Sequence, residues 1–141
     1  MSRAEPKHYL RPCLLLLLRE HADHGYDLVD RLAPLGLGDE DSGSVYRALR
    51  SLEHDGLVRS RWDRSAAGPV RRTYDLTADG LADLVGWVQA LEQTRSELDY
   101  FLYRYAVLVA TRQRTPLPRP PSRRAADEAP RDAGQVSPPE A

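Results

Sequence analysis

Five consecutive leucines at residues 14–18 constrain the fold of this chain more than any other feature. Pro12 suits the first turn of a helix, and a helix with leucine at five successive positions is apolar on every side. The run is too short to cross a bilayer, is bounded by Arg11 and Arg19, and lacks the small-residue cleavage site of a signal peptide. The sequence therefore predicts a buried helix that other elements of one domain must enclose.

Two further short helices are expected around it. The first begins near His24 and ends before Pro34. Its inward-facing residues are expected to be Tyr26, Leu28, Val29 and Leu32. The second follows a cap at Asp41 or Ser42, and Gly56 supplies the left-handed residue that ends it.

The stretch "GSVYRALRSLEHDGLV" at residues 43–58 is amphipathic. Its apolar stripe contains Val45, Ala48, Leu49 and Leu52, and its opposite face contains Gly43, Arg47, Arg50 and His54, flanked by Ser51 and Tyr46. An arginine fork matches the O6/N7 edge of guanine and pairs equally well with phosphate. Ser42, Ser44 and the free N–H groups of the first turn are placed to hold a phosphate. A solvated face with chance arginines is the alternative interpretation.

From residue 57 to residue 76 the hydrophobic period changes to two on both sides of a turn at "SAAGP", which predicts a two-stranded hairpin. Between residues 59 and 72 the chain has five arginines and one acidic residue, Asp63, although its net charge is -1. These arginines are Arg59, Arg61, Arg64, Arg71 and Arg72. A nucleic-acid function must therefore depend on local charge, since the whole chain has no basic field.

Three short helices followed by a hairpin are the arrangement of a winged helix-turn-helix, a mainly α fold with a small β-hairpin. In that fold the third helix enters the major groove of double-stranded DNA, and the hairpin lies against the backbone or the minor groove. Residues 1–76 are therefore expected to be a DNA-binding domain. A winged-helix module that binds a protein partner through the same basic face is the alternative function.

Residues 77–112 contain no proline and predict one long helix capped by Thr77. Apolar residues recur in it every three or four positions, as in a heptad seam. The expected dimerisation residues are Leu81, Leu84, Val88, Leu91, Leu98, Leu102 and Tyr105. One small domain cannot cover so long a stripe, so we expect a homodimer, with packing on the same domain as the alternative. Residues 113–141 are rich in Pro, Arg and Ala and are expected to be a disordered tail.

The stretches "HGYDLVDRL", "GSVYRALRSLEHDGLV", "RSRW" and "GPVRRTYDLTADG" resemble, in order and spacing, the signatures of the PadR family of bacterial transcriptional regulators over roughly residues 10 to 80. The resemblance implies a winged helix with a short C-terminal dimerisation helix, a homodimer on a palindromic promoter element, and repression relieved by a ligand. By position it places Ser44, Tyr46, Arg47 and Arg50 in the groove, Tyr26 at the backbone, and Arg64, Arg71 and Arg72 in the wing. Many relatives have proline after the tyrosine, so the base preference at Arg47 does not transfer.

The same resemblance implies a cavity for flat, apolar or aromatic effectors, lined by aromatic residues of the long helix. Trp87 is therefore the candidate for an effector pocket. Tryptophan is more often a packing residue, which is the alternative interpretation.

The sequence contains no pattern that indicates catalysis or metal binding. Cys13 is the only cysteine, which fits a reducing cytoplasm. His21 and His24 lack further ligands, and the calcium-loop pattern that begins at Asp39 has Arg50 where a glutamate is needed. There is no nucleophile elbow and no phosphate-binding glycine loop. We therefore expect a cytoplasmic protein that is not an enzyme, uses no metal or cofactor, and does not bind membranes.

Overall fold

The computed structural model describes residues 8–63, 68 and 70–122. The elements in chain order are α1 (Leu10–Glu20), β1 (Asp23–His24), α2 (Gly25–Arg31), the 3-10 helix η1 (Ala33–Leu35), α3 (Ser42–His54), β2 (Val58–Asp63), β3 (Arg71–Leu76) and α4 (Ala78–Gln113). The chain divides into two compact units, Met1–Leu91 and Glu92–Ala141, and α4 continues from the first into the second. The predicted fold class, mainly helical with a small sheet and a long C-terminal helix, is confirmed.

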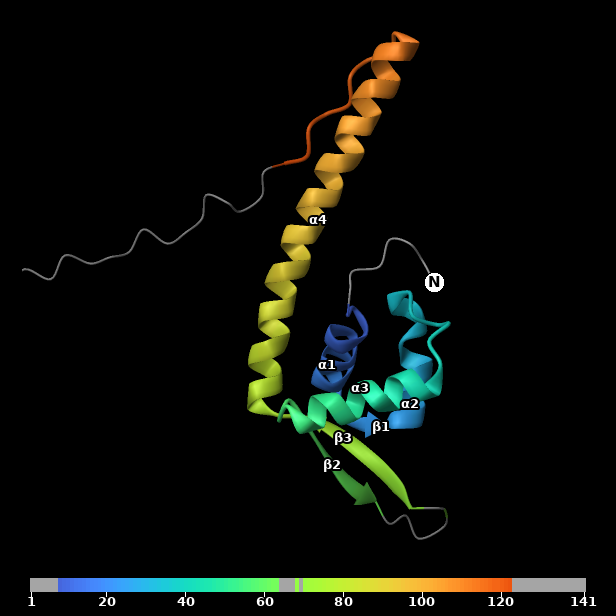
Figure 1. Cartoon of the computed structure of the whole chain (residues 1–141), viewed down its shortest axis with the longest axis vertical. Coiled ribbons are helices and arrows are strands. Elements are labelled where there is room, and N and C mark those ends of the chain that lie inside the picture. Colours follow the sequence, from blue (N-terminus) through green and yellow to red (C-terminus); the bar gives the residue numbers. More distant parts are fainter. Residues whose placement is uncertain (1–7, 64–67, 69, 123–141) are drawn as a thin grey trace, which may run out of the picture. The chain divides into compact units, whose positions relative to one another are not determined.

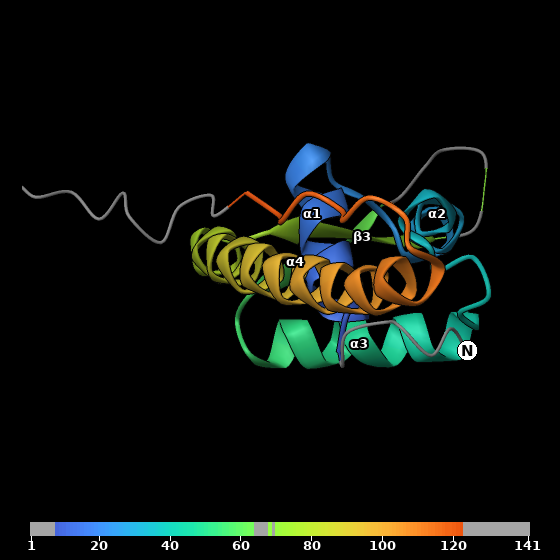
Figure 2. The ribbon, with the colours of Figure 1, turned by 90° about the horizontal axis from the view of Figure 1, so that it is seen from above.

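The core of the first unit forms around α1, as the leucine run predicted. Leu14, Leu15, Leu17 and Leu18 are all buried, and α1 lies among α2, α3 and β3 (Figures 1 and 2). Leu16 is exposed, although the sequence predicted that α1 would be buried on every side. Burial of one leucine side chain contributes about 1.5–3 kcal/mol, so α1 fixes the position of the elements that build the site.

β1 is a two-residue strand that the sequence did not predict. Asp23 pairs with Tyr74 and His24 pairs with Thr73, which gives a three-stranded antiparallel sheet in the order β1-β3-β2. A hydrophobic period cannot be recognised in two residues. The pairing joins the start of α2 to the hairpin.

α2 begins at Gly25, close to its predicted start. Leu28 and Leu32 are buried as expected, but the expectation that Tyr26 turns inward is wrong, because its side chain is 71% exposed. Gly25 takes the buried position beside it, where an added Cβ would lie only 2.5 Å from the Cε1 atom of Tyr46. The ring of Tyr46 therefore covers the first turn of α2.

α3 has the ends that the sequence predicted. The N–H of Ser44 donates to Oδ1 of Asp41 at 2.5 Å, and this hydrogen bond is the main reason that the pKa of Asp41 is lowered. At the other end Gly56 has φ +75°, a conformation that favours glycine, and its N–H donates to the carbonyl of Glu53. Val45, Leu49 and Leu52 are buried, so the opposite face of α3 is left for the site.

The predicted hairpin is present and is followed directly by α4. β2 and β3 pair from Val58 opposite Leu76 to Asp63 opposite Arg71, and the hairpin extends away from the helices (Figure 1). Oγ1 of Thr77 accepts a hydrogen bond from the N–H of Gly80 at 3.0 Å, which is the predicted cap of α4. The turn residues 64–67 and 69 lie outside the described residues, and so does the expected wing contact of Arg64.

Among the described residues, the second unit contains the C-terminal part of α4 and residues 114–122, which form neither helix nor strand. The N–H of Thr115 donates to the carbonyl of Ala110, which is buried. Residues 123–141 lie outside the described residues, so disorder in most of the tail stays a prediction. In the part of the chain that the structure describes, no helix is both long enough and apolar enough to cross a membrane.

Candidate nucleic-acid interface

A cleft of about 640 Å³ lies where the start of α2, the exposed side of α3 and the hairpin meet. It is lined by His24, Gly25, Tyr26, Tyr46, Arg50, Trp62, Val70, Arg71, Arg72 and Tyr74. None of these lining residues is acidic, whereas arginine comes from both α3 and β3. The cleft therefore combines positive charge with aromatic walls.

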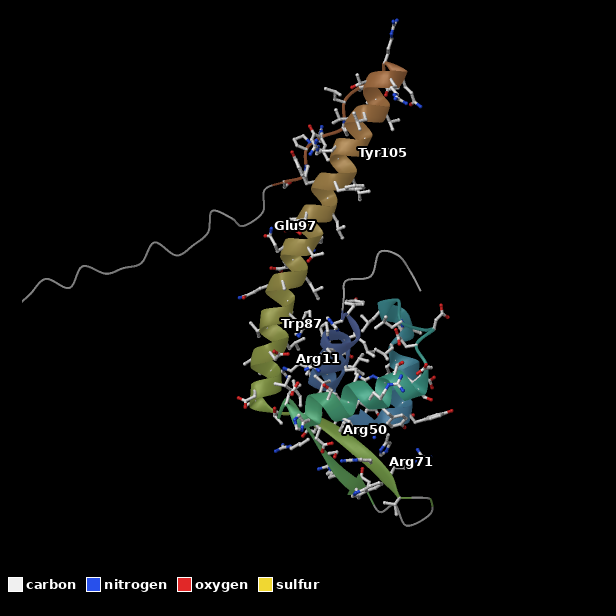
Figure 3. The ribbon with its side chains drawn as sticks, in the orientation of Figure 1. Arg11, Arg50, Arg71, Trp87, Glu97 and Tyr105 are labelled. Carbon is white, nitrogen blue, oxygen red and sulfur yellow. The ribbon has the colours of Figure 1, made fainter. Side chains whose placement is uncertain are left out.

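Arg50 and Arg71 are the free cations of this cleft. Figure 3 shows Arg50 on α3 and Arg71 on the hairpin at the same end of the first unit. Both residues are exposed, and neither has a hydrogen-bond or ion-pair partner among the described residues. An exposed guanidinium without a protein partner keeps all its donors for an anionic ligand.

Arg47 lies one turn before Arg50 on the same face of α3, outside the cleft lining. Its Nη2 donates to Oγ of Ser44 at 3.0 Å, so two of the predicted groove residues contact each other. Ser42 and Gly43 are exposed beside them in the first turn of α3. The N-terminal half of the exposed face is thus polar and open.

Arg72 differs from the other arginines of the hairpin because it is bound within the protein. Its Nη2 lies 3.0 Å from Oε2 of Glu53 and its Nε donates to Oγ of Ser60 at 2.7 Å. Its guanidinium also lies over the rings of Trp62 and Tyr74, at 5.6 and 5.7 Å from their centroids. The expected wing contact of Arg72 with DNA must therefore compete with four internal contacts.

Ser51 and His54 lie near the C-terminal end of α3 and do not line the cleft. Oγ of Ser51 accepts from Arg11 of α1 at 2.8 Å, and Arg11 also pairs with Asp55 at 2.9 Å. Ser51 is thus occupied by a contact to α1, while His54 is exposed. The structure brings Tyr26, Tyr46, Arg50, Arg71 and Arg72 together in the cleft and leaves Ser51 and His54 outside its lining.

The remaining hairpin arginines have acidic neighbours. Arg59 lies 3.3 Å from Asp75, and Arg61 lies 3.8 Å from Asp63, although both arginine side chains are largely exposed. The positive charge counted in the sequence is therefore partly neutralised, and Arg71 carries the unpaired charge of the described hairpin residues.

His24 and Trp62 line the cleft but were not among the predicted site residues. The Thr73 hydroxyl donates to Asp63 and lies 3.2 Å from Nδ1 of His24. This contact joins His24 of β1 to β3 beside the cleft. The alternating pattern around Trp62 predicts a strand. It does not predict that Trp62 lines the cleft, because the cleft forms only when α2, α3 and the hairpin pack together.

Trp87, the candidate effector residue, is half-buried against the core of the first unit. Its indole N–H donates to Oδ2 of Asp83 at 3.1 Å, one turn earlier in α4. Trp87 does not line the cleft between α2, α3 and the hairpin.

The predicted seam of α4 divides into buried and exposed residues. Leu84 belongs to the core of the first unit, so it cannot also face a partner chain as expected. Leu81 and Val88 are exposed in the same unit, and Leu91 is half-buried. In the second unit the exposed apolar residues Leu98, Phe101, Leu102, Tyr105 and Leu108 form a stripe, which we name the α4 stripe. Phe101 and Leu108 are members that the predicted seam omitted.

Comparison with known proteins relates the chain to one group of regulators. The family model "Transcriptional regulator PadR-like family" matches residues 14–85, and no curated protein matches the chain. The chain is similar to a PadR-like transcriptional regulator from Bacillus cereus, with 26% identity and a TM-score of 0.61 over 68% of this chain and 93% of that one. A PadR family transcriptional regulator from Eggerthella lenta has 30% identity and a TM-score of 0.59 over 66% and 80%. Bacillus subtilis PadR, solved in complex with operator DNA, has 25% identity and a TM-score of 0.52 over 60% and 48%.

Proposed function

The chain belongs to the PadR-like family of transcriptional regulators, because the family model covers residues 14–85, from within α1 to the first turns of α4, and we propose that it acts by binding operator DNA. The observation that carries the proposal is the cleft, in which Arg50 and Arg71 are exposed and no lining residue is acidic. The relative from Bacillus subtilis with operator DNA supports the same ligand class.

In the proposed complex α3 lies in the major groove. Arg47 and Arg50 face the base edges, where arginine donates two parallel hydrogen bonds to guanine. Arg71 and the first-turn residues Ser42 and Ser44 bind phosphates, which positions the protein without reading sequence. Tyr46 lies in the groove beside the arginines of α3, and Tyr26 contacts the DNA backbone.

The homodimer is proposed on the basis of the α4 stripe. Each of its five residues has another member three or four positions away, as in a coiled-coil seam, and all five are exposed in the single chain. A two-fold dimer matches a palindromic operator, since its two α3 helices reach half-sites about one helical turn apart. We further propose that the protein represses transcription in the cytoplasm. A flat, apolar effector that binds beside Trp87 relieves this repression.

Substitution of single arginines tests the assignment of roles. We expect Arg50→Ala or Arg47→Ala to reduce discrimination at particular operator positions by about 1–3 kcal/mol, because a base contact is lost. Arg71→Ala should weaken binding to all sequences more evenly, because a phosphate contact carries no sequence information. Titrations against a set of operator variants measure both effects.

Arg59→Ala is the matched control, because Arg59 is an exposed hairpin arginine that already has a carboxylate partner in Asp75. It should change operator affinity much less than Arg71→Ala. The assignment is rejected if Arg71→Ala alters base preference while Arg50→Ala weakens all sequences evenly.

A protein partner is the second candidate, favoured by one observation: Tyr26 and Trp62 are exposed next to Arg50 and Arg71. Tyrosine, tryptophan and arginine are the residues that dominate protein–protein hot spots. Salt separates the two functions, since DNA binding weakens linearly on a log–log plot as counterions are released. We expect that steep dependence for genomic fragments selected by the purified protein, and a shallow slope would favour the protein partner.

A further inference from the structure

One half-buried contact joins α3 to the hairpin, and we name it the Glu53–Arg72 tie. Arg72 contacts both carboxylate oxygens of Glu53, Oε2 at 3.0 Å and Oε1 at 3.3 Å. The Ser60 hydroxyl donates to Oε1 of Glu53 at 2.5 Å and accepts from Nε of Arg72 at 2.7 Å. Three side chains from α3, β2 and β3 thus form a closed triangle.

Each partner of the tie is close in sequence to one of the two free cations of the cleft. Glu53 follows Arg50 by three residues, which is about one turn of α3, and Arg72 follows Arg71 directly in β3. Two nitrogens of the guanidinium are held at once, because Nη2 contacts both carboxylate oxygens of Glu53 while Nε donates to Ser60. The rings of Trp62 and Tyr74 beside Arg72 further restrict its rotamers.

We propose that Glu53 is a positioning residue that holds the phosphate-binding arginine of the hairpin, Arg71, at a fixed place relative to the base-reading face of α3. This inference rests on the proposed DNA-binding function. With the tie in place, contacts of Arg50 and Arg71 with DNA form together on one rigid surface. Without the tie, the hairpin moves relative to α3, and the phosphate contact of Arg71 contributes less to the affinity for DNA.

The hairpin keeps other attachments that do not depend on the tie. Val58 and Tyr74 are buried in the core, and β3 pairs with β1 as well as with β2. A chain without the tie should therefore fold, which makes the positioning role separable from a purely structural role.

The test uses the full chain with Glu53→Gln and Arg72→Met together, a pair of substitutions that removes the tie without changing net charge. In the unsubstituted chain Arg71→Ala should weaken operator binding about tenfold. In the chain without the tie, Arg71→Ala should weaken it less than about twofold, whereas Arg50→Ala should keep its full effect. An undiminished Arg71→Ala effect in a folded chain would overturn the proposal.

Arg11→Met with Asp55→Asn is the matched control, because it removes a charge pair between α1 and the residue that follows α3, and this pair does not involve the hairpin. The Arg71→Ala effect should persist there. If the double substitution at Glu53 and Arg72 prevents folding, the single Glu53→Gln chain gives the same comparison, and an unchanged Arg71→Ala effect again overturns the proposal.

Hydrogen exchange of residues 58–63 and 71–76 in the free protein provides a readout that does not depend on DNA. We expect faster exchange in the hairpin without the tie, and unchanged exchange would contradict the proposal. If the unsubstituted chain does not select DNA, the DNA-binding function fails, and the exchange measurement still reports whether the tie holds the hairpin.

Discussion

A chain with Leu98→Asp should sediment as a monomer and lose operator affinity by about a hundredfold or more. Leu98 lies in the α4 stripe, where its side chain is half-exposed in the single chain. In the proposed dimer the stripe of one chain faces that of the other, and an aspartate there would be an unpaired charge in an apolar seam. Such burial costs several kcal/mol, which exceeds what a short seam can offset.

The loss of DNA binding follows without any change to an arginine of the cleft. A dimer places two α3 helices on one operator, so the second contact is intramolecular and strengthens binding by about 10²–10⁴-fold. A monomer keeps only the affinity of one half-site. Sedimentation measures the mass, and gel shift with a palindromic operator measures the binding.

Gln93→Asp is the control for added charge, because Gln93 is a polar, exposed residue of α4 that lies on a different side of the helix. We expect it to remain dimeric and to bind normally. A Leu98→Asp chain that also remains dimeric and binds normally would move the interface elsewhere, most simply to the leucine-rich α1, where Leu16 is exposed.

The elements that the sequence predicted well depend on local signals. Asp41 accepts from Ser44, three residues later, and Thr77 accepts from Gly80 at the same spacing. At the end of α3 the N–H of the left-handed Gly56 donates to the carbonyl of Glu53, three residues earlier. Capping residues therefore located the ends of the helices, and the hydrophobic period located the strands and the exposed face of α3. Both signals come from residues that are close together in the sequence.

The roles of individual arginines could not be predicted in the same way. Arg72 meets Glu53 across 19 positions of sequence, and Arg11 meets Ser51 across 40. No periodic pattern reports such contacts, because they arise from how α1, α3 and the sheet pack together. Only the structure separates arginines that hold elements together from Arg50 and Arg71, which are left for a ligand.

The same distinction explains how a chain with a net charge of -1 can present a cationic site. Acidic residues lie beside most of the hairpin arginines and neutralise them, as Asp75 does for Arg59. None lines the cleft, so the field there is positive although the average over the chain is not.

Gly80→Ala should lower the free energy of unfolding by about 2–3 kcal/mol, the cost of forcing extra volume into a closely packed position. An added Cβ would lie 2.0 Å from the carbonyl oxygen of Leu57 and 2.6 Å from Cδ1 of Leu76. The carbonyl cannot move aside easily, because it accepts a hydrogen bond from the N–H of Thr77. The contact therefore holds the first turn of α4 against the start of the hairpin.

Gly86→Ala in the same helix should instead raise the free energy of unfolding, because an added Cβ there meets no atom within 4 Å. Alanine in a helix interior is more stable than glycine by about 0.5–1 kcal/mol, so this chain should unfold at a higher temperature. Thermal and denaturant unfolding measures the stability of both variants. If Gly80→Ala proves as stable as Gly86→Ala, the close approach of α4 to Leu57 does not exist in solution. The hairpin would then depend on the Glu53–Arg72 tie and on its core residues for its place beside α3.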